Sequence, residues 1–159
     1  MTTMPAGVQR GFLRQTLQSP ANEIRPYTGF GSDLGGTKGR CLFAGSWNAD
    51  IYPALKVHSR PNDFYCAKNR MSGLWTPEQP LYKTLKMEKK STLLFTGVNT
   101  DQCVMGTLTN GYNDGWNCIL IDDCCGTPTV GGREVSFHNV SVSGALSLLI
   151  SKMGWPGSN

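Results

Sequence analysis

The fold is decided by residues 91–127, which read STLLFTGVNTDQCVMGTLTNGYNDGWNCILIDDCCGT. Residues 92–95 form a short apolar run that ends near Gly97, and this pattern predicts a buried strand. A tight loop follows, and a helix is then expected from Thr100, a residue type that favours the N-cap position. Residues 118–121 form a second apolar run and predict another buried strand. A strand, a helix and a strand at this spacing predict a βαβ unit with parallel strands.

The central helix of this unit has an apolar face. Val104, Leu108 and Tyr112 are four residues apart, so they are expected to lie on the same side of the helix and to face the core. Gly115 stands where a helix C-terminal stop is expected.

The chemistry of the unit is expected in the first turn of that helix. If Thr100 is the N-cap, Cys103 is the third helical residue, where the positive end of the helix dipole favours a thiolate. Asp101 acts in the opposite direction, because its negative charge disfavours a second anion nearby. Free cysteines are often simply buried, so the local pattern leaves both a nucleophilic and a packing role open for Cys103.

Three separated motifs resemble segments of the isochorismatase-like cysteine hydrolases, which include nicotinamidase, N-carbamoylsarcosine amidase and ureidoacrylate amidohydrolase. The nucleophile loop of that family is similar to GVNTDQCV at residues 97–104. GSWNADI at residues 45–51 resembles the segment before the family's central strand, and KNRMSGL at residues 68–74 resembles the lysine segment after that strand. The resemblance covers about residues 27–139 and is closest to a fungal branch. It implies a single domain over residues 1–159, with a three-layer, Rossmann-like parallel sheet covered by helices on both faces.

The resemblance implies a defined chemistry. Cys103 would attack an amide carbonyl to form a thioester, an amine would leave, and water would release the acid. Lys68 would hold the ionised thiol together with an aspartate that acts as proton shuttle. A non-proline cis peptide bond would join Val98 and Asn99, and the backbone amides of Asn99 or Thr100 and of Cys103 would form the oxyanion hole. Isochorismatase proper lacks the cysteine of this loop, so Cys103 favours amide chemistry.

The family's aspartate has no counterpart in the sequence. The family carries it at the end of an opening hydrophobic strand, but residues 1–25 contain no aspartate. The other acids that were considered lie elsewhere in the chain. Asp33 is in a glycine-rich loop, Asp50 is in the motif before the central strand, Asp101 is expected to point along its helix, and Asp122 and Asp123 end the second strand, where Asp122 is expected to be structural.

The two ends of the chain depart from the family pattern. Residues 1–20 are expected to form a short packing helix, because Val8, Phe12 and Leu13 lie on roughly one helical face. Residues 141–159 are apolar in part but do not match the family's last strand, and residues 153–159 are expected to be a frayed tail. The chain is therefore expected to be a family member that lacks its first strand and is incomplete at both ends, as a shortened gene product would be.

Between these ends the expected elements are short. The glycine-rich residues 27–45 are expected to form a surface loop, because the order of GTKG and the lack of a preceding apolar strand disfavour a phosphate-binding loop. Residues 51–55 predict a helical turn and residues 63–67 a strand that delivers Lys68 at its carboxyl end, where sites gather in parallel sheets. Helices are expected at residues 78–86 and 133–140.

Composition excludes several classes of function. The net charge of +4 is mild and the basic residues are scattered, which argues against nucleic acid binding. No apolar run has membrane-spanning length and no signal-peptide core opens the chain, so a cytoplasmic protein is expected. The six cysteines lack disulfide spacing and are expected to be free thiols. No metal or cofactor is expected, because His58 and His138 lie in unrelated segments.

The preferred hypothesis is a cysteine amidohydrolase that cleaves a small amide, with Cys103 as nucleophile and Lys68 assisting. Trp47, Arg70 and Trp75 are expected to line the pocket and suggest a planar or anionic substrate. The alternative is a catalytically impaired relative that serves as a binding or dimerising module, since the aspartate is missing. A thiol-based redox protein built on the adjacent Cys124 and Cys125 ranks last, because no resolving-cysteine spacing is evident. The expected partners are a small-molecule substrate and a second copy of the chain in a homo-oligomer.

Overall fold

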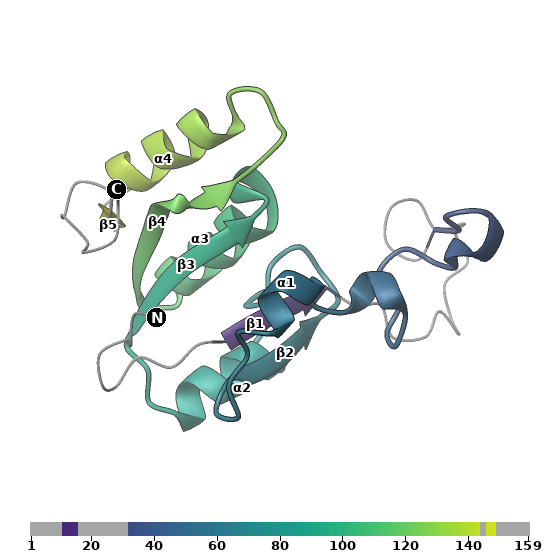
Figure 1. Cartoon of the computed structure of the whole chain (residues 1–159). Helices are drawn as coiled ribbons and strands as arrows, with labels where there is room; N and C mark the ends of the chain where they lie inside the picture. Colours follow the sequence, from purple (N-terminus) through teal and green to yellow (C-terminus); the bar gives the residue numbers. More distant parts are fainter. Residues whose placement is uncertain (1–10, 16–31, 144–145, 149–159) are drawn as a thin grey trace. The chain divides into compact units, whose positions relative to one another are not determined.

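The computed structural model describes residues 11–15, 32–143 and 146–148, and divides into two compact units, Met1–Arg70 and Met71–Asn159 (Figure 1). Within the described ranges, no helix combines the length and the apolar character needed to cross a membrane.

The first unit contains a two-stranded parallel sheet. Strand β1, Gly11–Gln15, pairs with strand β2, Phe64–Lys68, from Gly11 opposite Phe64 to Gln15 opposite Lys68. The helix expected over residues 1–20 is therefore wrong at β1, and the expectation that the opening strand is missing is wrong as well. The reason is that a five-residue strand takes its stability from a partner about fifty residues away, and no local periodicity reveals that partner.

Strand β1 reads Gly-Phe-Leu-Arg-Gln and carries no acidic residue. The chain thus has an opening strand without the aspartate that the resemblance places at its end.

Outside β2, residues 32–70 of the first unit form turns and short helices. The glycine-rich segment forms an exposed turn that is closed by an antiparallel bridge between Asp33 and Arg40. Its backbone bends where Gly35 has a φ of 79°, and the amide of Gly35 donates to the Asp33 carboxylate at 2.9 Å. The expected surface loop is confirmed over residues 32–45, and residues 27–31 lie outside the described residues. The short helical elements of this unit are η1 (Gly36–Lys38), η2 (Trp47–Ala49) and α1 (Pro53–Lys56).

The second unit is a parallel sheet with the strand order β3-β4-β5, connected through helices, so the predicted βαβ unit and the α/β class are confirmed. Its described elements follow the sequence prediction closely. They are α2 (Pro80–Met87), β3 (Thr92–Val98), η3 (Thr100–Val104), α3 (Met105–Asn113), β4 (Asn117–Gly126), α4 (Gly132–Val142) and β5 (Leu146–Leu148).

Strand β5 corrects the expectation for the end of the chain. It pairs in parallel with β4, from Ile119 opposite Leu146 to Ile121 opposite Leu148, so the strand that residues 141–159 were expected to lack is present. The tail expected at residues 153–159 lies outside the described residues.

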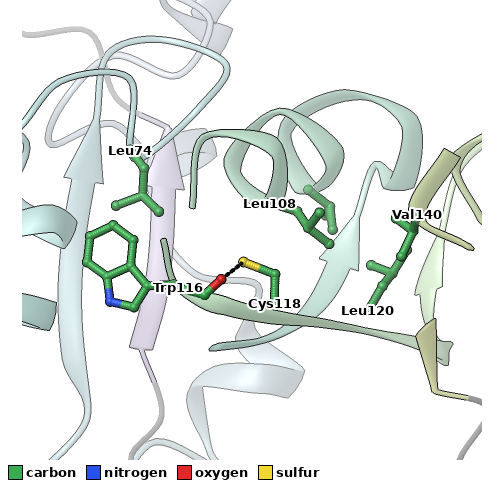
Figure 2. Close-up of a cluster of buried hydrophobic side chains, with 7 residues drawn as sticks. Leu74, Leu108, Trp116, Cys118, Leu120 and Val140 are labelled. Carbon is green, nitrogen blue, oxygen red and sulfur yellow. Dashed lines mark hydrogen bonds between the residues drawn. The ribbon is translucent and has the colours of Figure 1, made fainter. Parts of the chain in front are cut away.

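The core of the second unit joins its helices to β4. Cys118 and Leu120 alternate with their neighbours along β4 and share one face of the strand. Leu108 of α3 and Val140 of α4 belong to the same cluster (Figure 2), and α2 adds the partly buried Leu81 and Leu85. Crossover connections between parallel strands are right-handed, so successive connections between adjacent strands place their helices on the same face of the sheet. The full buried cluster is Leu74, Val104, Leu108, Trp116, Cys118, Leu120 and Val140.

Trp116 anchors the connection between α3 and β4 to α2. Its ring meets the Tyr82 ring edge-on, with centroids 5.1 Å apart, and its indole Nε1 donates to the Lys90 carbonyl at 2.8 Å. Lys86 Nζ lies 4.6 Å from the Trp116 ring centroid. The buried indole therefore has both its polar atom and its ring face engaged, as a buried tryptophan requires.

The pairing of β3 with β4 changes register beside the end of β3. Phe95 is opposite Leu120, but Gly97 is opposite Cys125, so β3 advances by two residues while β4 advances by five. The additional residues of β4 leave the ladder and then rejoin it, where Val98 pairs with Gly126. The end of β4 is thereby brought alongside the loop that follows β3.

Candidate active site

The predicted nucleophile loop, residues 97–104, connects β3 to α3. A cis peptide bond joins Val98 and Asn99, at the position that the resemblance implies. Cys103 follows in η3 and is partly exposed, and its Sγ donates to the Val98 carbonyl at 3.3 Å. The sequence-predicted loop residues and the thiol are thus brought together at the carboxyl end of β3, where parallel sheets place their sites.

The helix that carries Cys103 begins with a wide turn. The amides of Gln102 and Val104 both donate to the Asn99 carbonyl, at 3.2 and 3.3 Å, and the second bond spans five residues as in a π-type turn. Asn99 has extended backbone angles and is the N-cap, so the prediction that Thr100 caps the helix is wrong by one residue. Cys103 is consequently the fourth residue of the helical segment, still within its first turn.

Thr100 is fully buried at the start of this turn. Within the described part of the chain, its hydroxyl has no hydrogen-bond partner. Cys103 is held from the other side by α3, because Thr107 Oγ1 donates to the Cys103 carbonyl at 2.7 Å and accepts from the Gly73 amide at 3.1 Å. Gly73, in the part of the lysine motif that belongs to the second unit, therefore contacts the helix of the thiol.

Asp101 points away from the helix axis and into a neighbouring loop. Thr127 Oγ1 donates to Asp101 Oδ1 at 2.6 Å, and Thr127 Oγ1 in turn accepts from the Thr129 amide at 3.2 Å. The Thr127 hydroxyl, with smaller contributions from Thr129 and the backbone, lowers the pKa of Asp101 below its usual value. The expectation that this carboxylate points along the helix is wrong, and its lowered pKa makes it a poor acceptor of a proton.

Gly132, the first residue of α4, packs directly against Asp101. A Cβ atom at Gly132 would lie 2.9 Å from both Cγ and Oδ2 of Asp101, a separation that carbon atoms do not adopt. Gly131 precedes it as N-cap with a φ of 73°. The start of α4 can therefore approach the carboxylate only because residue 132 has no side chain.

The two acids of β4 have other surroundings. Asp122 is buried and forms an ion pair with Arg133 of α4. Asp123 is exposed next to Cys124, where burial first and the Asp123 charge second raise the pKa of the Cys124 thiol. Burial, with smaller contributions from the charges of Cys124 and Asp122, raises the pKa of the Cys125 thiol, against the opposing effects of its hydrogen bond to the Gly97 backbone and of the Arg133 charge.

Lys68 lies at the carboxyl end of β2, as predicted, and is only 4% exposed. Its Nζ donates to the Arg70 carbonyl at 2.9 Å. The Arg70 side chain is exposed and donates to the Asn69 carbonyl at 3.0 Å. Lys68 and Arg70 belong to the first unit, whereas Cys103 belongs to the second.

The two candidate pocket tryptophans also belong to different units. Trp47 is 71% exposed in the first unit, and its indole donates to the Lys38 carbonyl at 3.1 Å. Trp75 is 44% exposed in the second. The motif around Trp47 is a surface loop held by hydrogen bonds, because the Asn48 side-chain amide donates to the Arg40 carbonyl and its oxygen accepts from the Leu42 amide.

Among the residues that the structure describes, no three His, Cys, Asp or Glu side chains are grouped to hold a metal.

Sequence reasoning missed Thr127 and Gly132, both of which contact Asp101. The only signal was the run Thr-Pro-Thr followed by Gly-Gly, which is typical of a turn and gives no indication of a partner twenty-six residues earlier.

Comparison with known proteins places this geometry in a family. The Isochorismatase domain matches residues 11–149, beginning at the first residue of β1. The ureidoacrylate amidohydrolase RutB of Methylobacterium radiotolerans is 35% identical over 82 residues, which are 52% of this chain and 30% of the relative. RutB of Methylorubrum extorquens is 34% identical over 104 residues, which are 64% of this chain and 40% of the relative.

The fold is shared with a solved structure. Nicotinamidase PncA from Bacillus subtilis superposes with a TM-score of 0.69 at 18% identity, covering 89% of this chain and 75% of that structure. The chain spans less than half the length of the curated relatives it matches. The narrower fungal branch stays a prediction. Because the domain match extends over most of the sequence, this chain belongs to the isochorismatase family.

Proposed function

We propose that this chain is a cysteine hydrolase that cleaves the C–N bond of a small amide through a thioester on Cys103. The observation that carries the proposal is the position of the thiol, which is partly exposed in the first turn after the cis-peptide loop, with Sγ directed at the Val98 carbonyl. The similarity to ureidoacrylate amidohydrolases and the fold shared with a nicotinamidase support an amide as substrate.

In the first half of the reaction, the Cys103 thiolate forms a C–S bond to the amide carbonyl carbon. The carbonyl π electrons move to oxygen, and the amides of Asn99 or Thr100 and of Cys103 are the donors proposed to stabilise that charge. When the tetrahedral intermediate collapses, the C–N bond breaks and the leaving nitrogen takes the proton that the Cys103 thiol gave up on ionisation. Water then attacks the thioester, which yields the acid and restores the thiol.

Lys68 is proposed to stabilise the ionised thiol. Its burial supports the proposal, because a buried ammonium group requires anionic or carbonyl partners.

The substrate class rests on the two tryptophans and Arg70. Trp47 and Trp75 offer exposed aromatic faces, and Arg70 offers an exposed cation, so a planar or anionic amide is the proposed substrate. A cytoplasmic location and a homo-oligomeric state stay predictions of the sequence.

The test is ammonia release by the purified chain, with ureidoacrylate and nicotinamide as two probe amides of these shapes. Wild-type protein is expected to release ammonia from at least one, and Cys103→Ser is expected to lose turnover and iodoacetamide labelling at position 103. Cys124→Ser is the matched control, since Cys124 is an exposed cysteine on β4, and it should keep turnover. A wild-type protein that neither turns over these amides nor is labelled at Cys103 would overturn the proposal.

A second candidate is a catalytically impaired relative that binds without turnover. The observation that favours it is strand β1, which carries no acid. In that case Cys103→Ala would retain both the ligand binding and the self-association of the wild-type chain, measured by calorimetry with the same amides and by light scattering. Loss of binding in Cys103→Ala would count against it.

A further inference from the structure

A group of four residues, which we name the Asp101 clamp, connects the nucleophile helix to the loop after β4. It consists of Asp101, Thr127, Thr129 and Gly132. At 2.6 Å the bond from Thr127 Oγ1 to Asp101 Oδ1 is short, as expected for a hydroxyl that donates to an ionised carboxylate. Thr127 Oγ1 is itself fixed by the Thr129 amide at 3.2 Å and lies 3.3 Å from Thr129 Oγ1.

The clamp is closed on its other side by α4. Gly132 approaches the carboxylate so closely that a methyl group at this position would overlap with it. The carboxylate therefore lies at the N-terminus of an eleven-residue helix, where the helix dipole favours a negative charge. The lowered pKa of Asp101 agrees with an ionised group held in this way.

The clamp bears on the thiol through η3. Asp101 and Cys103 are both in the wide turn, whose amides at Gln102 and Val104 share one acceptor, the Asn99 carbonyl. A turn with a shared acceptor and five-residue spacing is a weaker constraint than a regular helical turn. Contacts from outside the turn are therefore needed to fix the direction of the Cys103 side chain.

We propose that Asp101 is a positioning residue for Cys103, held by the hydroxyl of Thr127 and by the close approach of Gly132. This inference rests on the proposed function in so far as it concerns turnover. It also accounts for an acid two residues from a nucleophilic thiol. An unpaired carboxylate there would oppose the thiolate, whereas the Thr127 hydroxyl and the α4 N-terminus offset its charge.

The experiment compares Thr127→Val, which has the same shape without the hydroxyl, with Thr127→Ser, which keeps the hydroxyl. Thr109→Val is the matched control, because Thr109 donates to the Met105 carbonyl at 2.9 Å on an exposed face of α3 outside the clamp. Asp101→Asn is a second route, since the amide oxygen accepts the Thr127 proton without the charge. Circular dichroism establishes that each variant is folded.

Turnover of the better probe amide gives the first readout. Thr127→Val is expected to lower kcat about tenfold while KM stays within about twofold, and Thr127→Ser is expected to restore kcat, as loss of a hydrogen bond to a charged group predicts. Thr109→Val should match the wild type. A Thr127→Val variant that unfolds at a lower temperature but keeps the wild-type kcat would show that the Asp101 clamp has only a structural role, and would overturn the proposal.

Hydrogen exchange gives a readout that does not depend on turnover. Residues 96–108 form a chymotryptic peptide, bounded by Phe95 and Leu108, whose only cysteine is Cys103. In Thr127→Val this peptide should exchange faster and its thiol should be alkylated at a changed rate, while peptides from α2 keep wild-type exchange. If the wild type hydrolyses no amide, the proposed function fails, and this exchange pattern alone decides the clamp. Uniform acceleration over the whole unit, or none, would overturn it.

Discussion

The two compact units differ in how they bury their apolar side chains. Within residues 32–143, whose burial the structure describes, the first unit buries the apolar residues Ala49 and Cys66, whereas the second buries eight, including all of the cluster in Figure 2. The first unit exposes Trp47, Tyr52 and Val57 instead. The predicted nucleophile loop therefore lies on a packed core, while Lys68 lies at the end of a two-stranded sheet. The difference teaches that the geometry of Cys103 depends on β4 and its helices, and it can be tested by mutation.

The largest effect is expected where a core residue is truncated. Leu120→Ala should lower the free energy of unfolding by about 2–5 kcal/mol, because Leu120 is 0% exposed at the centre of β4. Leu55→Ala in the first unit is the matched truncation at a 55% exposed site and should change it by less than about 0.5 kcal/mol. Urea unfolding measures both, and equal losses would break the contrast between the units.

The next effect depends on pH. Burial raises the pKa of the Cys118 thiol from 9.0 to about 11, so the unfolded chain loses this proton at lower pH than the folded chain. Stability should therefore fall as the pH rises from about 9 to about 11, by at most about 2 kcal/mol from this thiol. The measurement is unfolding at both pH values in wild type and Cys118→Val.

Other groups also titrate in this pH range. The prediction is therefore tested by the difference in stability loss between the wild type and Cys118→Val. Cys118→Val should show the smaller fall, and Cys124→Ser, at an exposed thiol, should keep most of the wild-type fall. Identical pH dependence in wild type and Cys118→Val would show that Cys118 is not enclosed by the core.

A smaller effect tests the packing of α3 against β4. A Cβ atom at Gly111 would lie 3.2 Å from Cys118 Sγ and 3.3 Å from Leu74, both of which are buried. Gly111→Ala should therefore lower the free energy of unfolding by about 1 kcal/mol, since overpacking outweighs the gain in helix propensity. At Gly106 a Cβ atom would meet only ordinary contacts, from 3.6 Å, so Gly106→Ala should raise stability slightly. Thermal unfolding of both variants checks the opposite signs.

The smallest effect concerns the surface of α2. Lys86→Gln removes an ammonium group that lies over the Trp116 ring and should cost about 0.5 kcal/mol. Lys83→Gln, an exposed lysine on the same helix, should cost less. Chemical unfolding followed by tryptophan fluorescence compares the two, and a larger loss at Lys83 would contradict the assignment.

The sequence predicted the second unit well because its signals are local. The apolar runs of β3 and β4 and the spacing of Val104 and Leu108 are each read within a few residues, and both side chains are buried as expected. Tyr112 departs from this pattern, since its ring is 42% exposed and its hydroxyl reaches the Ser143 carbonyl at the end of α4. A polar tip that finds a distant backbone partner is not visible in helical spacing.

What the sequence did not reveal is non-local. Strand β1 is defined by its pairing with β2, and the Asp101 contact to Thr127 depends on the register change in β4. The site prediction shows the same limit. The resemblance of an eight-residue motif implied the cis peptide bond between Val98 and Asn99, whereas the roles predicted for Lys68 and Trp47 depend on segments far from that motif in the chain.

Between Phe95 and Gly97, β4 advances by more residues than β3. The number of residues in β4 therefore sets where the end of this strand meets the predicted nucleophile loop. Four residues, 121–124, lie between the two stretches of β4 that pair with β3, and Thr127, just after the second stretch, contacts Asp101. Substitutions at residues 121–124 leave the number of residues in β4 unchanged, but removal of a single residue would shorten the reach of the chain by about 3.5 Å. Insertions and deletions there are thus expected to be far less tolerated than changes of residue type.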